Sequence, residues 1–110
     1  MKGKIILLPF PFTDLKTTKR RPALVILERP NDVVVAFISS IIPKPREQHY
    51  IIIDKDDKSF PITGLKVTSA IYLDKIATIS KNLIIGELGQ IDKRLKYKIN
   101  KIMKKIYHLK

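Results

Sequence analysis

Residues 22–28 read Pro-Ala-Leu-Val-Ile-Leu-Glu, and residues 33–39 read Val-Val-Val-Ala-Phe-Ile-Ser. Both runs are rich in β-branched and aliphatic residues, which pack well on a pleated sheet. Between them stands Arg-Pro-Asn-Asp, at residues 29–32, whose composition favours a turn. The sequence therefore predicts a β-hairpin, with Pro22 at the first position of its first strand, where a missing N–H is tolerated.

Further strands are expected on both sides of this hairpin. Residues 4–8 and 49–53 are short apolar runs, and Pro-Phe-Pro punctuation follows the first of them. Residues 13–20 are rich in Thr and Lys and show no periodicity, which predicts a loop. Residues 68–79 alternate between a strand-like pattern and one short helical turn, and residues 83–90 fit one more strand.

The hydrophobic period changes at Asp92, a suitable helix N-cap. Apolar residues then recur on one face of a helix, at Leu95, Ile99, Ile102, Met103 and Ile106. Such a helix needs a sheet to cover its apolar stripe. Short strands, frequent prolines and one C-terminal amphipathic helix favour a mainly β fold with some α, a small β-barrel formed by residues 1–110 as a single domain.

The composition excludes several classes of protein. The 110 residues hold 22 Lys and Arg against 10 Asp and Glu, a formal net charge of +12. The chain has no Cys, which excludes disulfide frameworks, thiol catalysis and thiolate zinc sites, and its two His are too few for a His-rich metal centre. No apolar run approaches the roughly 20 residues of a membrane span, so we expect a cytoplasmic protein.

The excess positive charge lies at the two ends of the sequence. Residues 1–22 hold six basic residues and one acid, residues 23–91 are balanced, and residues 92–110 hold eight basic residues and one acid. A Lys-rich solvated helix face accounts for much of the C-terminal block. The N-terminal block contains adjacent arginines, and this favours a polyanionic partner.

Three stretches carry a resemblance to a known family. They are Pro-Phe-Pro-Phe-Thr-Asp-Leu with Lys-Arg-Arg-Pro-Ala-Leu-Val-Ile (residues 9–15 and 19–26), Val-Val-Ala-Phe-Ile-Ser-Ser (34–40), and the run over 64–79. In this order they resemble the PemK/MazF toxins of type II toxin–antitoxin modules. The resemblance implies a dimeric SH3-like barrel that cleaves single-stranded RNA without a metal or cofactor. It also implies the mechanism, in which the substrate 2′-hydroxyl attacks the adjacent phosphorus and leaves a 2′,3′-cyclic phosphate and a 5′-hydroxyl.

The resemblance also implies catalytic residues. Arg21 matches the catalytic arginine, whose planar donors suit phosphate oxygens. Ser39 matches a catalytic Thr of the best-known members; serine keeps the hydroxyl but loses the methyl that restricts χ1. Asp74 matches a common acidic position and would orient Arg21 or accept a proton. Tyr72 and Ala77 stand where some relatives carry a basic residue, so the general acid stays unassigned.

The expected RNA-binding residues surround these positions. In the family, the loop before Arg21 borders the RNA groove, and Lys19 and Arg20 are expected to contact phosphate. The full expected set is Lys16, Thr18, Lys19, Arg20, Ser40 and His49. His49 is also a possible proton shuttle. Phe10 and Phe12 fit core packing better than base stacking.

Three functions therefore stay open. The first is a toxin endoribonuclease acting on mRNA and neutralised by a small acidic antitoxin. The second is a toxin of the same barrel that inhibits gyrase, as CcdB proteins do, and the third is a barrel that binds nucleic acid without cleaving it. The arginine followed by a hydroxyl residue at the end of the next strand favours the first.

Overall fold

The computed structural model describes residues 1–9, 19–43 and 49–109. The strands are β1 (Lys4–Pro9), β2 (Arg20–Glu28), β3 (Asp32–Ser39), β4 (Tyr50–Ile53), β5 (Ser69–Ser80) and β6 (Gly86–Gln90). One α-helix, α1 (Lys93–Ile106), follows them, and short 3-10 turns cover Pro61–Thr63 and Lys81–Leu83.

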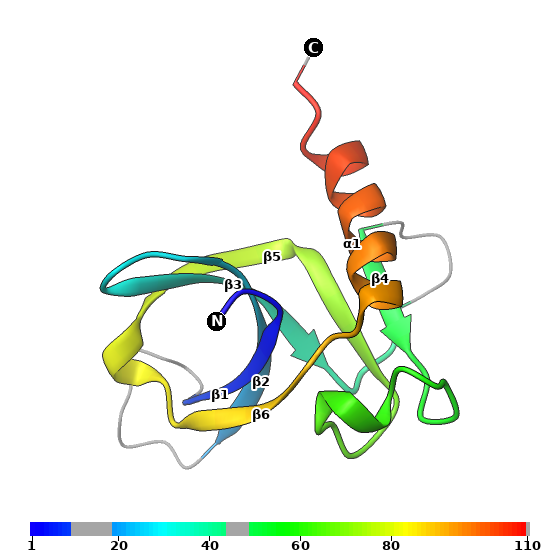
Figure 1. The fold of residues 1–110 in the computed structure, drawn as a ribbon, viewed down its shortest axis with the longest axis horizontal. Helices are drawn as coiled ribbons and strands as arrows, with labels where there is room; N and C mark the ends of the chain where they lie inside the picture. The colour runs from blue at the N-terminus through cyan, green and yellow to red at the C-terminus, as the bar shows by residue number, and fades with distance from the viewer. Residues whose placement is uncertain (10–18, 44–48, 110) are drawn as a thin grey trace.

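All six strands belong to one antiparallel sheet in the order β4-β5-β3-β2-β1-β6. The sheet curls into a half-barrel, and α1 stands beside β4 and β5 (Figure 1). The expected mainly β barrel with a C-terminal helix is confirmed in this half-barrel form.

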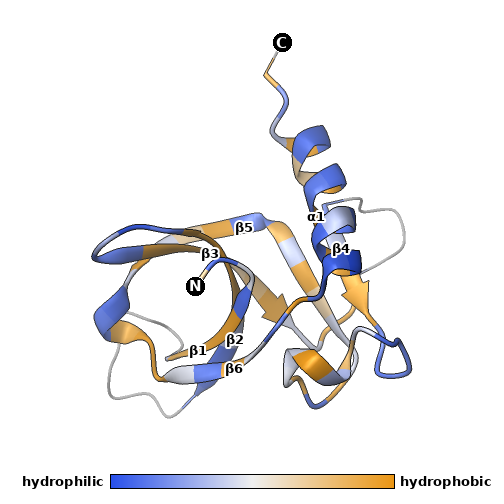
Figure 2. Ribbon diagram, in the orientation of Figure 1, coloured by the Kyte–Doolittle hydropathy of each residue, from blue (hydrophilic) through white to orange (hydrophobic). Residues whose placement is uncertain are grey.

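The two faces of the curled sheet carry separate hydrophobic clusters. One contains Ile5, Leu24 and Ile71 together with Leu95 and Ile99 of α1. The other lies on the opposite face of the strands and contains the residues Ile6, Leu8, Ala23, Val25, Val33, Val35 and Ile79. Orange and blue segments alternate along much of the sheet, and α1 shows both colours (Figure 2). Burial on both faces explains why the central strands are such continuous apolar runs.

The helix begins as the sequence predicts. The Asp92 carboxylate accepts a hydrogen bond of 2.9 Å from the backbone N–H of Leu95, which satisfies one of the free donors of the first turn. Leu95 and Ile99 are buried, and the later apolar residues of the stripe pack against the same cluster. Among the described residues, no helix is long and apolar enough to cross a membrane.

The predicted start of the hairpin was wrong by two residues. β2 begins at Arg20, so Pro22 is its third residue, and Arg20 lies in a strand rather than in a loop. The reason is long-range pairing: β1 continues to Pro9, and its last two residues pair with Arg21 and Arg20.

The sequence pattern left residues 68–79 open between a strand and one short helical turn. In the structure, residues 69–79 belong to the twelve-residue strand β5. Its pairing with β3 changes from Ile38↔Ile71 to Ala36↔Ile76, so β5 passes five residues where β3 passes two. This irregularity bends β5 and breaks the simple alternation by which a strand is recognised.

Candidate functional site

Arg21 and Ser39 occupy matching positions at one end of the β2–β3 ladder. The terminal pair of that ladder is Ala23↔Phe37, so Arg21 and Ser39 each lie two residues beyond it. Because side chains alternate along a strand, both residues stand on the same face as Ala23 and Phe37. Arg21 is exposed, and Ser39 is half-buried.

A β-bulge sets this match. Leu27 pairs with Val34, but the next pair is Val25↔Val35, so Ile26 is one extra residue on β2. Without the extra residue, the register would bring Ser40 opposite Arg21 and place Ser39 on the other face. The bulge therefore selects which of the two serines accompanies the arginine.

The Ser39 hydroxyl is held by the segment that follows it. Its oxygen accepts a hydrogen bond of 3.1 Å from the backbone N–H of Ile41. The carbonyl of Ile41 in turn accepts a hydrogen bond of 3.0 Å from the hydroxyl of Tyr72 in β5. Ser40 is exposed and lies outside the strand.

Asp74 forms an ion pair with His49. The Oδ2 atom of Asp74 lies 3.7 Å from Nδ1 of His49, and both side chains are open to solvent. Leu73 holds the two backbones together, because its N–H donates to the His49 carbonyl over 2.8 Å. The hydroxyl of Tyr107 donates to the Leu73 carbonyl; burial and the nearby Asp74 charge raise the pKa of that tyrosine. The sequence did not indicate this pairing, because it depends on how β4 aligns with β5.

Two tyrosines and a lysine lie beside these residues. Tyr50 and Tyr72 are register partners in the β4–β5 ladder, with ring centroids 6.4 Å apart. The ammonium of Lys75 lies 4.4 Å from the centroid of the Tyr72 ring. The sequence analysis noted Tyr72 only as a departure from a basic residue, and it missed Tyr50 and Lys75. Tyr-x-x-Lys spacing puts the two side chains on opposite faces of a regular strand, so the sequence carried no signal for this contact.

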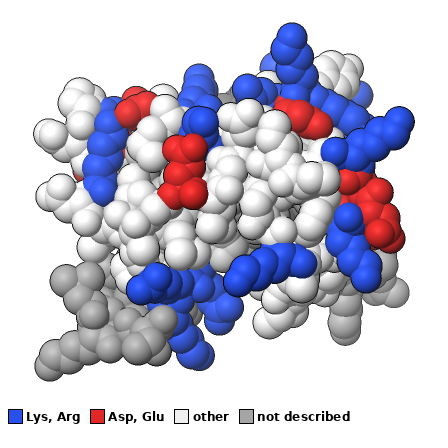
Figure 3. All heavy atoms as spheres, turned by 60° about the horizontal axis from the view of Figure 1, so that its bottom comes forward, with Lys and Arg blue, Asp and Glu red and all other residues white. Residues whose placement is uncertain are grey.

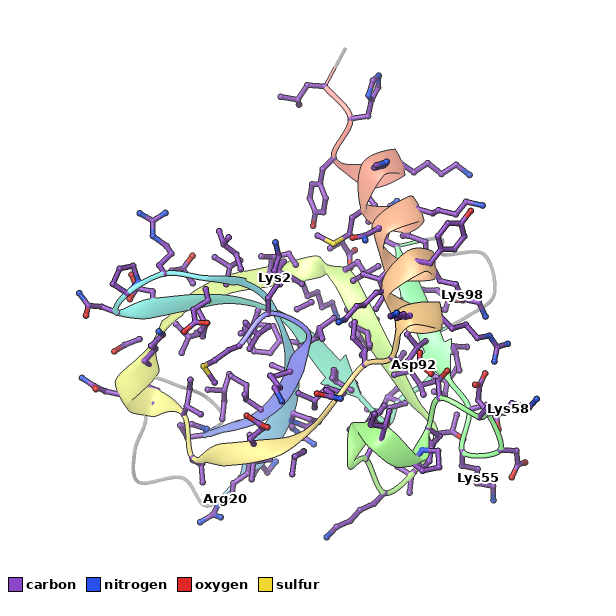
Figure 4. All side chains as sticks on the ribbon, viewed as in Figure 1. Lys2, Arg20, Lys55, Lys58, Asp92 and Lys98 are labelled. Carbon is purple, nitrogen blue, oxygen red and sulfur yellow. The ribbon has the colours of Figure 1, made fainter. Side chains whose placement is uncertain are left out.

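Two basic residues directly precede Arg21 in the chain. Lys19 and Arg20 are exposed at the start of β2, where Arg20 points away from the barrel (Figure 4). Figure 3 shows basic side chains, and fewer acidic ones, among uncharged surface on the face that it views. The expected RNA-binding residues Lys16 and Thr18, and the residues Phe10 and Phe12, lie outside the described part of the chain.

The family model of PemK-like, MazF-like toxins of type II toxin–antitoxin systems matches residues 1–107. The chain belongs to the PemK/MazF family. No curated protein gives a significant match.

Solved structures share the PemK/MazF fold with this chain. An endoribonuclease from a mycobacterial species, in complex with its cognate antitoxin, is 18% identical with a TM-score of 0.74, over 100% of this chain and 96% of the other. A second mycobacterial endoribonuclease is 16% identical with a TM-score of 0.72, over 99% and 91%. The Mycobacterium tuberculosis toxin MazF-mt6 is 18% identical with a TM-score of 0.70, over 97% and 98%. At these identities the likeness shows the fold.

This PemK/MazF chain also has a groove on the α1 side of the sheet. Its volume is about 780 Å³, and its apolar floor comes mainly from β2 and α1, including Leu24, Ile26 and Met103. Three lysines, Lys2, Lys96 and Lys104, also line it, and its described lining contains no acidic residue. The groove combines an apolar floor with positive charge.

Proposed function

We propose that the chain is the endoribonuclease toxin of its module and that it cleaves single-stranded RNA through the RNA's own 2′-hydroxyl. The observation that carries the proposal is the register of the β2–β3 ladder, whose bulge leaves Arg21 and Ser39 each two residues beyond the terminal pair Ala23↔Phe37. A guanidinium and a hydroxyl on one face of a sheet end provide donors that can converge on a phosphate.

The nucleophile of the reaction belongs to the RNA itself, so no covalent bond forms between the protein and the substrate. The 2′-oxygen attacks the adjacent phosphorus, the bond from phosphorus to the 5′-oxygen breaks, and the products are a 2′,3′-cyclic phosphate and a 5′-hydroxyl. The guanidinium of Arg21 stabilises the negative charge that grows on the phosphorus oxygens. The Ser39 hydroxyl donates its hydrogen to one of those oxygens, while its own oxygen accepts the hydrogen bond from the Ile41 N–H.

The His49–Asp74 pair handles the protons. One imidazole nitrogen faces the carboxylate, so the other can exchange a proton with the RNA. In this assignment Asp74 orients His49 rather than Arg21. The pair takes the proton of the 2′-hydroxyl as the 2′-oxygen attacks, and that proton is returned to the leaving 5′-oxygen, so the protons balance.

The partners follow from charge. An acidic antitoxin and RNA are both polyanions, and the chain carries a net charge of +12. We assign the groove between α1 and β2 to an acidic amphipathic segment of the antitoxin, because the lysines and the apolar floor of the groove match such a segment. A second copy of this chain fits less well, because it would bring the same positively charged lysines to the groove. The active form is a homodimer acting on mRNA in the cytoplasm, as the family resemblance implies.

Cleavage of single-stranded RNA in excess EDTA tests the proposal. The expected products carry 2′,3′-cyclic phosphate and 5′-hydroxyl ends. Binding without cleavage would favour a non-catalytic nucleic-acid-binding barrel. Intact RNA together with inhibited supercoiling by gyrase would favour the CcdB-like alternative.

A further inference from the structure

We infer that Tyr72 is a positioning residue for the reaction: its hydroxyl holds Ile41 so that the Ile41 N–H fixes the rotamer of Ser39. The inference rests on the proposed function for its catalytic consequence. Its structural core is a chain of two hydrogen bonds, from Tyr72 to the Ile41 carbonyl and from the Ile41 N–H to the Ser39 hydroxyl.

The segment that carries Ile41 depends on this bond. The ladder of β3 ends at Ser39, and residues 40–43 belong to no strand. The Ile41 side chain is 77% exposed, so apolar packing does not hold it. The hydrogen bond of 3.0 Å from Tyr72 ties this residue to β5, 31 positions further along the chain.

Tyr72 itself is firmly placed. Its neighbours Ile71 and Leu73 are fully buried, which fixes the strand on either side of it. Its ring lies beside Tyr50 and beneath the ammonium of Lys75, an arrangement that restricts the ring in both directions. The hydroxyl therefore reaches Ile41 from a rigid support.

The bond to Ser39 compensates for a missing methyl group. Threonine has a restricted χ1 because it is β-branched, whereas serine rotates among three staggered rotamers. An N–H donor at 3.1 Å selects the rotamer that points the serine oxygen toward Ile41. The oxygen keeps its own hydrogen for donation to phosphate. Tyr72 and Ile41 thus restrict χ1 of Ser39 through hydrogen bonds, whereas the methyl group of a threonine would restrict it sterically.

The test is the variant Tyr72→Phe, which removes the hydroxyl and keeps the ring. With single-stranded RNA in EDTA, we expect kcat to fall about 3- to 10-fold, as for the loss of one hydrogen bond, and KM to stay unchanged. Tyr97→Phe is the control, because Tyr97, an exposed tyrosine of α1, also has a lysine over its ring, at 5.4 Å. An unchanged kcat in Tyr72→Phe, or a change in KM alone, overturns the inference.

A second substitution separates positioning from general damage. In a Ser39→Thr background the methyl group restricts χ1 by itself, so Tyr72→Phe should then change kcat by less than about 2-fold. An equal loss in both backgrounds would show that Tyr72 acts through the fold and not through the Ser39 rotamer.

A structural readout makes the inference independent of activity. The Hα–Hβ couplings of Ser39, measured by NMR, should report one rotamer in the wild type and in Tyr97→Phe, and averaging in Tyr72→Phe. Unchanged couplings in Tyr72→Phe contradict the inference. A wild type that leaves RNA intact contradicts the proposed function, and the couplings still decide whether Tyr72 fixes Ser39.

Discussion

Nδ1 of His49, just before β4, lies 3.7 Å from the Asp74 carboxylate oxygen Oδ2 in β5, although the two residues are 25 positions apart in sequence. A carboxylate beside one ring nitrogen orients the imidazole ring. The pair is held at the backbone by Leu73, whose N–H donates to the carbonyl of His49.

The first prediction concerns this pair. His49→Gln and Asp74→Asn should each lower the single-turnover rate of RNA cleavage about 100-fold, the lower end of general acid–base catalysis. The double variant should be little worse than either single variant, because the two residues act as a unit. Asp56→Asn, in the exposed loop after β4, is the control. Losses that multiply in the double variant would mean that the residues act separately.

The second prediction concerns Arg20, exposed at the start of β2. Arg20→Ala should raise KM with little change in kcat, because a phosphate contact contributes to binding without choosing bases. The dependence of log affinity on log salt concentration should become shallower by about 0.7 for single-stranded RNA. Lys58→Ala, which Figure 4 shows at the lower right, away from Arg20, should leave both quantities unchanged. An unchanged salt dependence in Arg20→Ala would remove Arg20 from the RNA interface.

The third prediction concerns stability in acid. The Lys81 ammonium, 2.6 Å from Glu28, and the amino group of Met1 lower the pKa of Glu28 from 4.5 to about 2. The folded state therefore binds the proton less tightly than the unfolded state. The Glu28 contribution to the free energy of unfolding should be complete above pH 4.5 and should disappear as the pH falls toward about 2.

Denaturant titrations across this range check it. Glu28→Gln should lower the free energy of unfolding at pH 7, and its difference from the wild type should shrink as the pH falls from 4.5 to 2. Lys81→Gln should weaken the same pH dependence, because Lys81 is the larger cause of the shift. A difference between Glu28→Gln and the wild type that is constant over this range would contradict the assignment.

The fourth prediction concerns the groove beside α1. Lys104→Glu reverses one of its lining charges, and should lower the affinity for the acidic antitoxin about tenfold at low salt and less at high salt. RNA cleavage should not change. Lys98→Glu, on the same helix but outside the groove lining, is the control. Equal effects of both variants would indicate general attraction by the basic helix, and no effect of Lys104→Glu would place the antitoxin elsewhere.

Local patterns in the sequence were enough for part of this fold. The β2–β3 hairpin follows from two apolar runs around residues 29–32, and α1 follows from its apolar stripe and from the Asp92 cap. Both depend on residues that are close in sequence. The start of β2 and the length of β5 could not be predicted in this way, because they depend on pairing with β1 and on the irregular register with β3.

The candidate site was likewise predictable only in part from the sequence. Arg21 and Ser39 were identified from the family resemblance, but their match across the ladder requires the extra residue Ile26, which no turn signal reveals. The His49–Asp74 and Tyr72–Ile41 contacts join β5 to residues far away in sequence. These contacts depend on how β3 and β4 pair with β5, which the sequence alone does not show.

The most direct measurement of the central claim is the single-turnover rate of single-stranded RNA cleavage in EDTA by the wild type, Arg21→Ala and Arg29→Ala. Arg29 is an exposed arginine in the turn at the other end of β2, so its variant controls for the loss of one positive charge. If Arg21 stabilises the phosphorane, Arg21→Ala should be slower about 100- to 1000-fold and Arg29→Ala should keep the wild-type rate. Wild-type cleavage by Arg21→Ala, or an equal loss in both variants, would contradict the account.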